Sequence, residues 1–182
     1  LDRDSHPVPP VLRLQSPKDF GNADISVARY TTKELHEREV ERLWKRVWQF
    51  ACREEDIPEP GDHIRYDIAG LSFLVVRTQS GVIKAYPNAC LHRGRMLKEF
   101  DGHASELRCA FHGFCWHLDG KLKDVPAKWD FPHIEDAKFS LPELPVALWA
   151  GFVFINPDQK CAPFAEHIKD LASQFERWDL SK

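Results

Sequence analysis

The sequence predicts a mainly β domain of small antiparallel sheets with a helix on either side. From about Gly61, apolar residues recur with a period of two, which is typical of half-buried strands. Apolar residues at helical spacing occur instead near residues 31–50 and 163–178. Apolar runs are short, and Leu71 to Val76, among the longest, falls well below the ~20 residues that a membrane helix needs. We therefore expect no membrane segment.

The N-terminal part of the chain is predicted to be an extended arm followed by a helix. The arm, residues 1–30, contains the prolines Pro7, Pro9, Pro10 and Pro17. A lead-in helix is predicted over residues 31–50, because Thr31 and Glu34 have the spacing of a capping box. The apolar side of this helix consists of Leu35, Leu43, Trp44, Val47 and Trp48.

Residues 51–160 are predicted to form the main domain. Its first candidate strands, separated by glycine-containing turns, are Asp62–Ile68, Leu71–Arg77 and Val82–Tyr86. A hairpin is predicted over residues 114–123, with Asp119 and Gly120 at its tight turn.

The C-terminal part of the domain begins with a proline-rich stretch. Residues 124–145 contain four prolines and are predicted to be a long ordered loop. The last candidate strands are Val146–Trp149 and Gly151–Ile155. Pro163 then favours the start of an exit helix within residues 161–182, and this helix is expected to end at about Trp178.

Two short motifs of matching composition are the strongest functional signal. They are Cys90-Leu91-His92-Arg93-Gly94 and Cys109-Ala110-Phe111-His112-Gly113. Two cysteines and two histidines can hold either one zinc ion or a [2Fe–2S] cluster with mixed ligation. Each motif supplies one residue of each kind, which favours the cluster. The inner iron would then bind Cys90 and Cys109, and the outer iron would bind His92 and His112. The glycines allow two loops to turn tightly around a compact inorganic core.

Composition excludes some other functions. The net charge of −3 and the pI of about 6.3 provide no basic surface for nucleic acid. The chain has five cysteines, and the three outside the motifs are Cys52, Cys115 and Cys161. An odd number of cysteines suits a reducing compartment better than a disulfide framework. Together with the absence of a signal-peptide pattern, this predicts a cytoplasmic location.

The motifs and their surroundings resemble the Rieske family, and in particular the N-terminal domain of the α subunit of Rieske non-haem iron ring-hydroxylating oxygenases. The resemblance covers roughly residues 31–178. The segments that carry it are Trp44–Trp48, Cys52–Pro58, Pro60–Asp62, Asn88–Gly94, His112–Phe114, Asp119–Gly120, Val125–Pro126 and Gly151–Asn156. One departure is Phe114, where many family members have Trp.

The resemblance implies an electron-transfer function. A Rieske domain of this kind would receive electrons from a reductase or ferredoxin. It would deliver them to a mononuclear non-haem Fe(II) in its own catalytic domain or in that of a neighbouring subunit of a homo-oligomer. The oxygenase would hydroxylate aromatic or related hydrophobic substrates. That iron needs two histidines and a carboxylate. After Asn156 the sequence has a single histidine, His167, and the chain starts with Leu1 rather than Met. We therefore expect an excised piece that lacks the oxygen-activating site.

The same resemblance predicts the redox class. The Rieske proteins of respiratory and photosynthetic complexes carry a disulfide at positions that correspond to Arg95 and Phe111, and hydroxyl donors at those of Phe114 and Trp116. Without those donors the reduced cluster is less stabilised, so we expect a potential of about −150 mV, at the low end of the Rieske range.

Two alternatives stay open. One is a stand-alone Rieske ferredoxin, although such carriers are nearer ~100 residues long and have no need of flanking helices. The other is a structural zinc module without a redox role. Arg93 and Arg95 either face an electron donor or form salt bridges within the loops.

Overall fold

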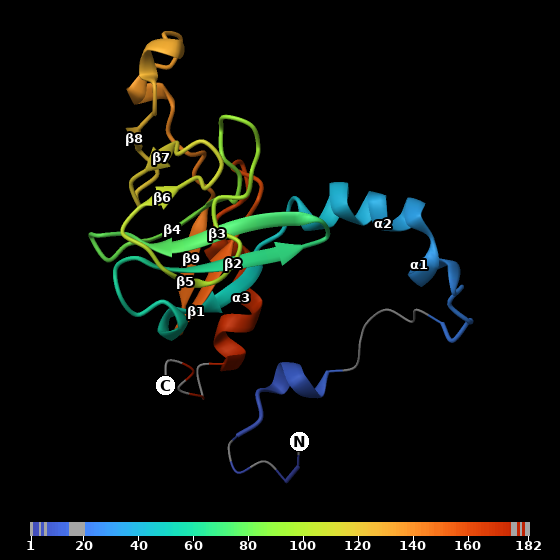
Figure 1. Ribbon diagram of the computed structural model, residues 1–182. Helices are drawn as coiled ribbons and strands as arrows, with labels where there is room; N and C mark the ends of the chain where they lie inside the picture. The colour runs from blue at the N-terminus through green and yellow to red at the C-terminus, as the bar shows by residue number, and fades with distance from the viewer. Residues whose placement is uncertain are drawn as a thin grey trace.

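The computed structural model describes residues 2–3, 5, 7–14, 21–175, 178 and 180. Three small antiparallel sheets form the body of the molecule, which confirms the predicted fold class (Figure 1). The first sheet has the order β1-β10-β9, with strands Gln49–Arg53, Phe152–Ile155 and Val146–Trp149. The second has the order β4-β3-β2-β5, with strands Ile83–Pro87, Leu71–Arg77, Asp62–Ile68 and Gly102–His103. The third has the order β6-β7-β8, with strands Leu107–Arg108, Cys115–Trp116 and Leu122–Asp124.

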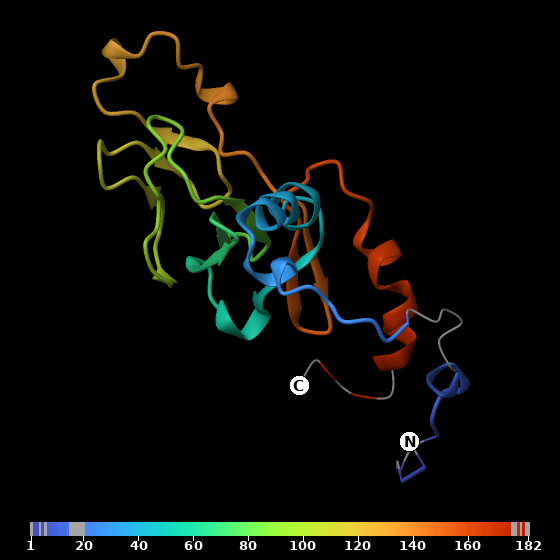
Figure 2. The same ribbon diagram turned by 90° about the vertical axis from the view of Figure 1, so that its right-hand side faces the viewer.

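Strand β3 connects two hydrophobic cores because it is buried on both faces. Leu74 and Val76 belong to a core that also contains Cys90 and Cys109. The alternate residues of β3 belong to a second core with β10 and β1, which contains Cys52, Ile57, Phe73, Val75, Ile83, Ala85, Leu144, Val153 and Ile155. In both views the third sheet and the loop after β8 lie at one end of the molecule, away from helix α3, Phe164–Phe175 (Figures 1 and 2). The first core therefore packs the two cysteines against side chains of the third sheet, among them Leu107 and Trp116.

Most strands follow the predicted pattern. β2, β3 and β9 have the predicted bounds, and β4 is shifted by one residue. In the predicted hairpin, Trp116 of β7 pairs with Leu122 of β8. The long loop after it contains two short 3-10 helices, Lys128–Asp130 and Asp136–Lys138. Local alternation and glycine turns were therefore sufficient to predict this part of the fold.

The prediction of one helix over residues 31–50 is wrong. Two short helices, α1 at Ala28–Thr31 and α2 at Lys33–Glu39, are followed by a π-helical turn at Val40–Trp44. The chain then enters β1 at Gln49, whose Nε2 donates to the carbonyl of Trp44 at 2.6 Å and closes the end of the helix. β1 pairs with β10, which lies about a hundred residues later, so tertiary pairing outweighs the local helical spacing.

The predicted capping box is also wrong. Thr31 is the last residue of α1, and its hydroxyl donates to the carbonyl of Val27. Thr32 precedes α2, but its hydroxyl donates to the carbonyl of Ala28 at 2.8 Å and caps no N–H of the helix. Both hydroxyls bond backward along the chain, which is the usual competitor of an N-cap.

The terminal segments differ in part from the prediction. Within the described part of residues 1–30 there is a 3-10 helix at Pro10–Arg13, and α1 already begins at Ala28. A further 3-10 helix covers Glu54–Asp56 after β1. α3 ends at Phe175, and residues 176 and 177, where the exit helix was expected to continue, lie outside the described residues. The division of the chain into an N-terminal arm, a main domain over residues 51–160 and an exit segment over residues 161–182 stays a prediction. Over the described residues, no helix is both long enough and apolar enough to cross a membrane.

Candidate metal centre

The two cysteine–histidine motifs form loops of the same construction. We call Cys90–Arg95 loop 1 and Cys109–Phe114 loop 2. In each loop the N–H of the cysteine donates to the carbonyl of the last residue, at 2.7 Å in loop 1 and 2.8 Å in loop 2. The glycine N–H donates to the carbonyl of the cysteine, at 2.8 and 3.0 Å. Gly94 and Gly113 both adopt the left-handed conformation, with φ of 72° and 77°.

The cysteines of the two loops are buried side by side. The exposed fractions of Cys90 and Cys109 are 3% and 2%, and both are free thiols. Burial raises the pKa of the Cys90 thiol, as does its contact with Cys109, whereas the backbone N–H of His92 lowers it. A buried thiolate is costly unless a cation or a metal compensates its charge. The pair therefore fits a metal that binds two thiolates.

The histidines also lie together. The rings of His92 and His112 have centroids 4.8 Å apart. Nδ1 of His92 is buried and has no hydrogen-bond partner among the described residues. Burial, followed by the charges of His112 and Arg93, lowers the pKa of His92 and so favours the neutral form of its imidazole. A neutral imidazole with an unsatisfied buried nitrogen is the form that binds a metal. The residues present thus fit a cluster held by two thiolates and two imidazoles.

An aromatic shell surrounds the histidines unequally. Phe114 stacks on His92, with centroids 4.5 Å apart, and Phe131 meets the same ring edge-on at 5.5 Å. His112 is exposed and contacts Phe111, with centroids 3.8 Å apart. The sequence does not point to Phe131, because this residue lies on the long loop and no local pattern relates it to His92.

A buried amide holds loop 1. Asn88 Oδ1 accepts hydrogen bonds from the backbone N–H groups of Leu97 and Lys98, at 3.1 and 3.0 Å. Its Nδ2 donates to the carbonyl of Lys98 at 2.8 Å and to the hydroxyl of Ser72 at 3.2 Å. Asn88 thus ties the chain just before Cys90 to the chain that leaves the loop. In the sequence, Asn88 was notable only as the first residue of the segment Asn88–Gly94, which carries part of the family resemblance.

At the two positions where high-potential Rieske proteins have hydroxyl donors, this chain has the buried aromatic residues Phe114 and Trp116. Phe114 and Trp116 are 1% and 0% exposed. The indole Nε1 of Trp116 donates to the carbonyl of Phe139 at 2.9 Å, so its only donor is used there. This arrangement supports the expected low potential.

The two arginines of loop 1 have different surroundings. Arg95 forms a salt bridge with Glu99, four residues later. Arg93 is exposed and lines an open pocket of about 610 Å³ together with Phe100 and Phe111. For Arg95 the structure therefore shows the internal salt bridge.

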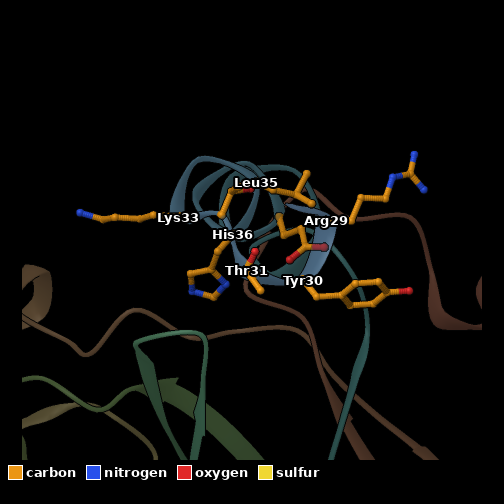
Figure 3. Close-up of a pocket in the computed structure, with 8 residues that line it drawn as sticks. Arg29, Tyr30, Thr31, Lys33, Leu35 and His36 are labelled. Atoms are coloured by element: carbon orange, nitrogen blue, oxygen red, sulfur yellow. The ribbon is translucent and has the colours of Figure 1, made fainter. Parts of the chain in front are cut away.

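Among the described residues, the four predicted ligands included, no three His, Cys, Asp or Glu side chains converge as they would around a single metal ion. A cluster with two thiolates on one iron and two imidazoles on the other does not require such convergence. A pocket of about 650 Å³ along α1 and α2 contains none of the four predicted ligands, and its Arg29 and Lys33 side chains extend in opposite directions (Figure 3).

Comparisons with known proteins agree on the type of domain. Residues 47–138 match the family described as the Rieske [2Fe-2S] domain. The chain is 32% identical to the large subunit of anthranilate 1,2-dioxygenase from Acinetobacter baylyi, over 80% of this chain and 31% of that protein. It is 27% identical to the carnitine monooxygenase oxygenase subunit from Acinetobacter pittii, over 87% of this chain and 44% of that protein.

A solved structure is similar as well. The structure of a quaternary ammonium Rieske monooxygenase, described in connection with carnitine oxidation and inter-subunit electron transfer, superimposes with a TM-score of 0.76 at 26% identity. The match covers 82% of this chain and 41% of that one. The chain thus spans between about a third and a half of the length of these relatives.

Proposed function

Because the chain belongs to the Rieske [2Fe–2S] domain family, we propose that it receives single electrons from a reductase or ferredoxin and passes them to the mononuclear iron of an oxygenase catalytic domain. Its cofactor is a [2Fe–2S] cluster. The observation that carries the proposal is the pairing of two buried thiols with two adjacent imidazoles, one of which has an unsatisfied buried nitrogen.

The proposed ligands are the four residues of the two motifs. Cys90 and Cys109 would hold the inner iron, and His92 and His112 would hold the outer iron. When bound, the cluster supplies one-electron redox chemistry. The protein contributes the two rigid loops, the burial of the thiolates and the aromatic cover over His92.

The two histidines then differ in what they can contact. Phe114 and Phe131 cover His92, whereas His112 is exposed beside Phe111. A ligating imidazole keeps a second ring nitrogen, which can donate to a carboxylate. The exposed His112 is therefore the better candidate for the contact with a carboxylate of the catalytic domain.

The partner domain and the substrate belong to the whole protein. Inter-subunit electron transfer is described for the quaternary ammonium monooxygenase. By analogy, we infer a homo-oligomer in which a neighbouring subunit, or the chain's own continuation, supplies the mononuclear iron and hydroxylates the substrate. The names of the relatives include both anthranilate and carnitine, so the proposed substrates include aromatic and quaternary ammonium compounds. The cytoplasmic location stays part of the proposal.

A stand-alone electron carrier is the second candidate function. It is less well supported because the compared relatives are oxygenase subunits, and because the similarity extends over 80% or more of the chain. The length of the natural reading frame separates the two functions. The match to a [2Fe–2S] family favours the cluster over a zinc module.

Anaerobic loading with iron and sulfide tests the proposal. We expect two irons and two acid-labile sulfides per chain, and the electron paramagnetic resonance (EPR) signal of a mixed-ligand cluster after reduction. Cys109→Ser should lose most of the cluster, and His112→Cys should keep iron with a lower potential because a thiolate adds negative charge.

A matched control is available in the same region. Cys115 is also buried and free but lies outside the proposed ligand set. Cys115→Ser should load a full cluster. Full occupancy in Cys109→Ser would remove Cys109 from the ligand set, and zinc without iron in the purified wild type would contradict the redox function.

A further inference from the structure

A single arginine side chain spans the outside of loop 2. Arg108 is the last residue of β6 and directly precedes Cys109. Its Nη1 donates a hydrogen bond of 3.0 Å to the carbonyl oxygen of Gly113, the residue that directly follows His112. The side chain therefore connects the residue before the cysteine of loop 2 to the residue after its histidine.

The hydrogen bond from Arg108 is the second of two that hold the turn at Gly113. The N–H of Gly113 donates to the carbonyl of Cys109 at 3.0 Å, and the carbonyl of Gly113 accepts from Arg108. The peptide groups on both sides of its Cα are thus held. A Cβ at this position would lie 3.0 Å from Cγ of Pro126, so the neighbouring chain leaves little space for a different conformation. Because His112 directly precedes this turn, the direction of its side chain depends on the turn.

Arg108 is itself oriented by the neighbouring strands. Its Nε donates to Oε1 of Glu106 at 2.7 Å, and the other carboxylate oxygen of Glu106 accepts from Lys123 at 2.6 Å. Nη1 of Arg108 also lies 3.5 Å from Oδ2 of Asp124 in β8. The guanidinium is a planar fork, so these contacts fix the direction in which Nη1 points. Two cations and two anions cancel formally, which means that the network provides orientation rather than a net charge.

Among the described residues, loop 1 has no equivalent charged contact. Loop 1 is held instead by the side-chain amide of Asn88, which is 3% exposed and lies just before the loop. The charged pair of Arg95 and Glu99 lies at the surface. The two loops share a backbone pattern but are held by different means, one by a buried amide and one by a charged side chain.

We propose that Arg108, oriented by Glu106, is a positioning residue for His112: it fixes the Gly113 turn so that the imidazole faces the outer iron of the cluster. The proposal rests on the ligand set proposed above and adds a residue that touches neither metal nor substrate. Partners that hydrogen-bond a metal-binding histidine directly cost about 10–100-fold in metal affinity or activity when they are removed, and Arg108, which acts through the Gly113 turn, should reach no more than this range.

The test compares three variants with the wild type in the cluster-loaded chain. Arg108→Met removes the donor and the charge, Arg108→Lys keeps the charge without the planar fork, and Arg95→Met removes the same charge beside the other loop. The measurements are the rate of iron loss to a ferrous chelator and the ¹⁴N couplings of the two imidazoles in pulsed EPR of the reduced protein.

We expect Arg108→Met and Arg108→Lys to lose iron faster, by no more than about 10–100-fold, with a change in the ¹⁴N coupling of one imidazole only. Arg95→Met should match the wild type in both measurements. Wild-type behaviour of Arg108→Met would overturn the proposal. Equal acceleration in Arg95→Met would also overturn it, because that result would mean that charge alone matters. Full rescue by Arg108→Lys would overturn it as well, because an ammonium group lacks the planar fork that joins Glu106 to the Gly113 carbonyl.

A second variant keeps the test decisive if Arg108→Met does not fold by circular dichroism. Glu106→Gln keeps Arg108 in place but weakens its anchor, so it should change the same single ¹⁴N coupling with a smaller acceleration of iron loss. Unchanged couplings in Glu106→Gln would then reject the proposal. Failure of the proposed ligand set can be distinguished from failure of the Arg108 proposal. If the ligand set is wrong, Cys109→Ser will keep a full cluster, and this outcome does not depend on the Arg108 variants.

Discussion

The ring of Phe114 lies flat on the imidazole of His92, with centroids 4.5 Å apart and planes inclined by 13°. Phe114 is 1% exposed, so the stacked pair excludes water from this side of the proposed cluster. High-potential Rieske proteins carry a hydroxyl donor at the position that corresponds to Phe114. The stacking therefore replaces a hydrogen bond with an apolar contact, and this exchange should be measurable as a redox potential.

Restoring the missing donors should raise the potential. In a Phe114→Ser, Trp116→Tyr double variant, each new hydroxyl that reaches a sulfur atom favours the more negative reduced cluster. A hydrogen bond that contributes about 1 kcal/mol would shift a one-electron potential upward by about 40 mV. Protein-film voltammetry of the loaded chain measures this shift.

The control for that experiment is Phe114→Ala. It removes the ring from His92 without adding a donor, and it shows how much of any change comes from lost packing or from water entry. If the double variant has no higher potential than Phe114→Ala, the hydrogen-bond explanation of the low potential is wrong.

Removing the Asn88 amide should destabilise the domain. Asn88→Ala would leave the N–H groups of Leu97 and Lys98 without an acceptor, and an unsatisfied buried group costs about 1–3 kcal/mol. We expect the free energy of unfolding to fall by about 2 kcal/mol and iron loss from loop 1 to accelerate. Chemical denaturation under anaerobic conditions measures the first effect.

Gln79→Ala is the matched control, because Gln79 is an exposed amide in the turn after β3. This substitution should change the free energy of unfolding by no more than about 0.5 kcal/mol. Equal stability of Asn88→Ala and the wild type would mean that water replaces the amide, and that Asn88 does not lock the loop.

The sequence was informative where structure depends on near neighbours. The bounds of β2 and β3 follow from alternation and from the glycine turn between them. The matching composition of the two motifs predicted that Cys90 and Cys109, and likewise His92 and His112, lie together, and the structure places each pair in contact. Their role as cluster ligands stays a prediction.

Contacts between distant segments were not predictable in the same way. β1 forms where helical spacing continues, because β10 supplies its partner. Phe131 reaches His92 from a loop whose path depends on the whole third sheet. The contact from Arg108 to Gly113 is close in sequence, but it depends on the hairpin geometry that brings both ends of loop 2 together. A pattern of residue types contains none of this information.

The chain of residues 1–182 should accept an electron yet hydroxylate nothing. Oxygen activation needs a mononuclear iron held by two histidines and a carboxylate. The sequence after Asn156 contains one histidine, His167, and therefore lacks the second histidine of such a site. We expect anaerobic reduction followed by O₂ to reoxidise the cluster without product from candidate aromatic or quaternary ammonium substrates. Adding the catalytic domain should restore turnover. Stoichiometric hydroxylated product from this chain alone would show that a second iron site exists.

The ion network around Glu106 should make part of the stability depend on acid pH. Hydrogen bonds from Lys123 and from Arg108 lower the pKa of Glu106 from 4.5 to about 2. Because the pKa is lower in the folded state than in the unfolded state, the carboxylate stabilises the fold fully above about pH 4.5. This contribution shrinks as the pH falls from about 4.5 toward 2, and it is lost below about pH 2, where the carboxylate becomes protonated in the folded state as well.

The difference in unfolding free energy between the wild type and Glu106→Gln should therefore be constant from pH 8 to about 5.5 and shrink below about pH 4.5. Tryptophan fluorescence during urea unfolding measures it in cluster-free protein, after circular dichroism has established that the sheets are retained. Glu135→Gln breaks an exposed ion pair with Lys138 and should change stability by less than about 1 kcal/mol. An equal difference between wild type and Glu106→Gln at pH 3 and pH 7 would mean that Lys123 and Arg108 do not stabilise the charged carboxylate in the folded protein.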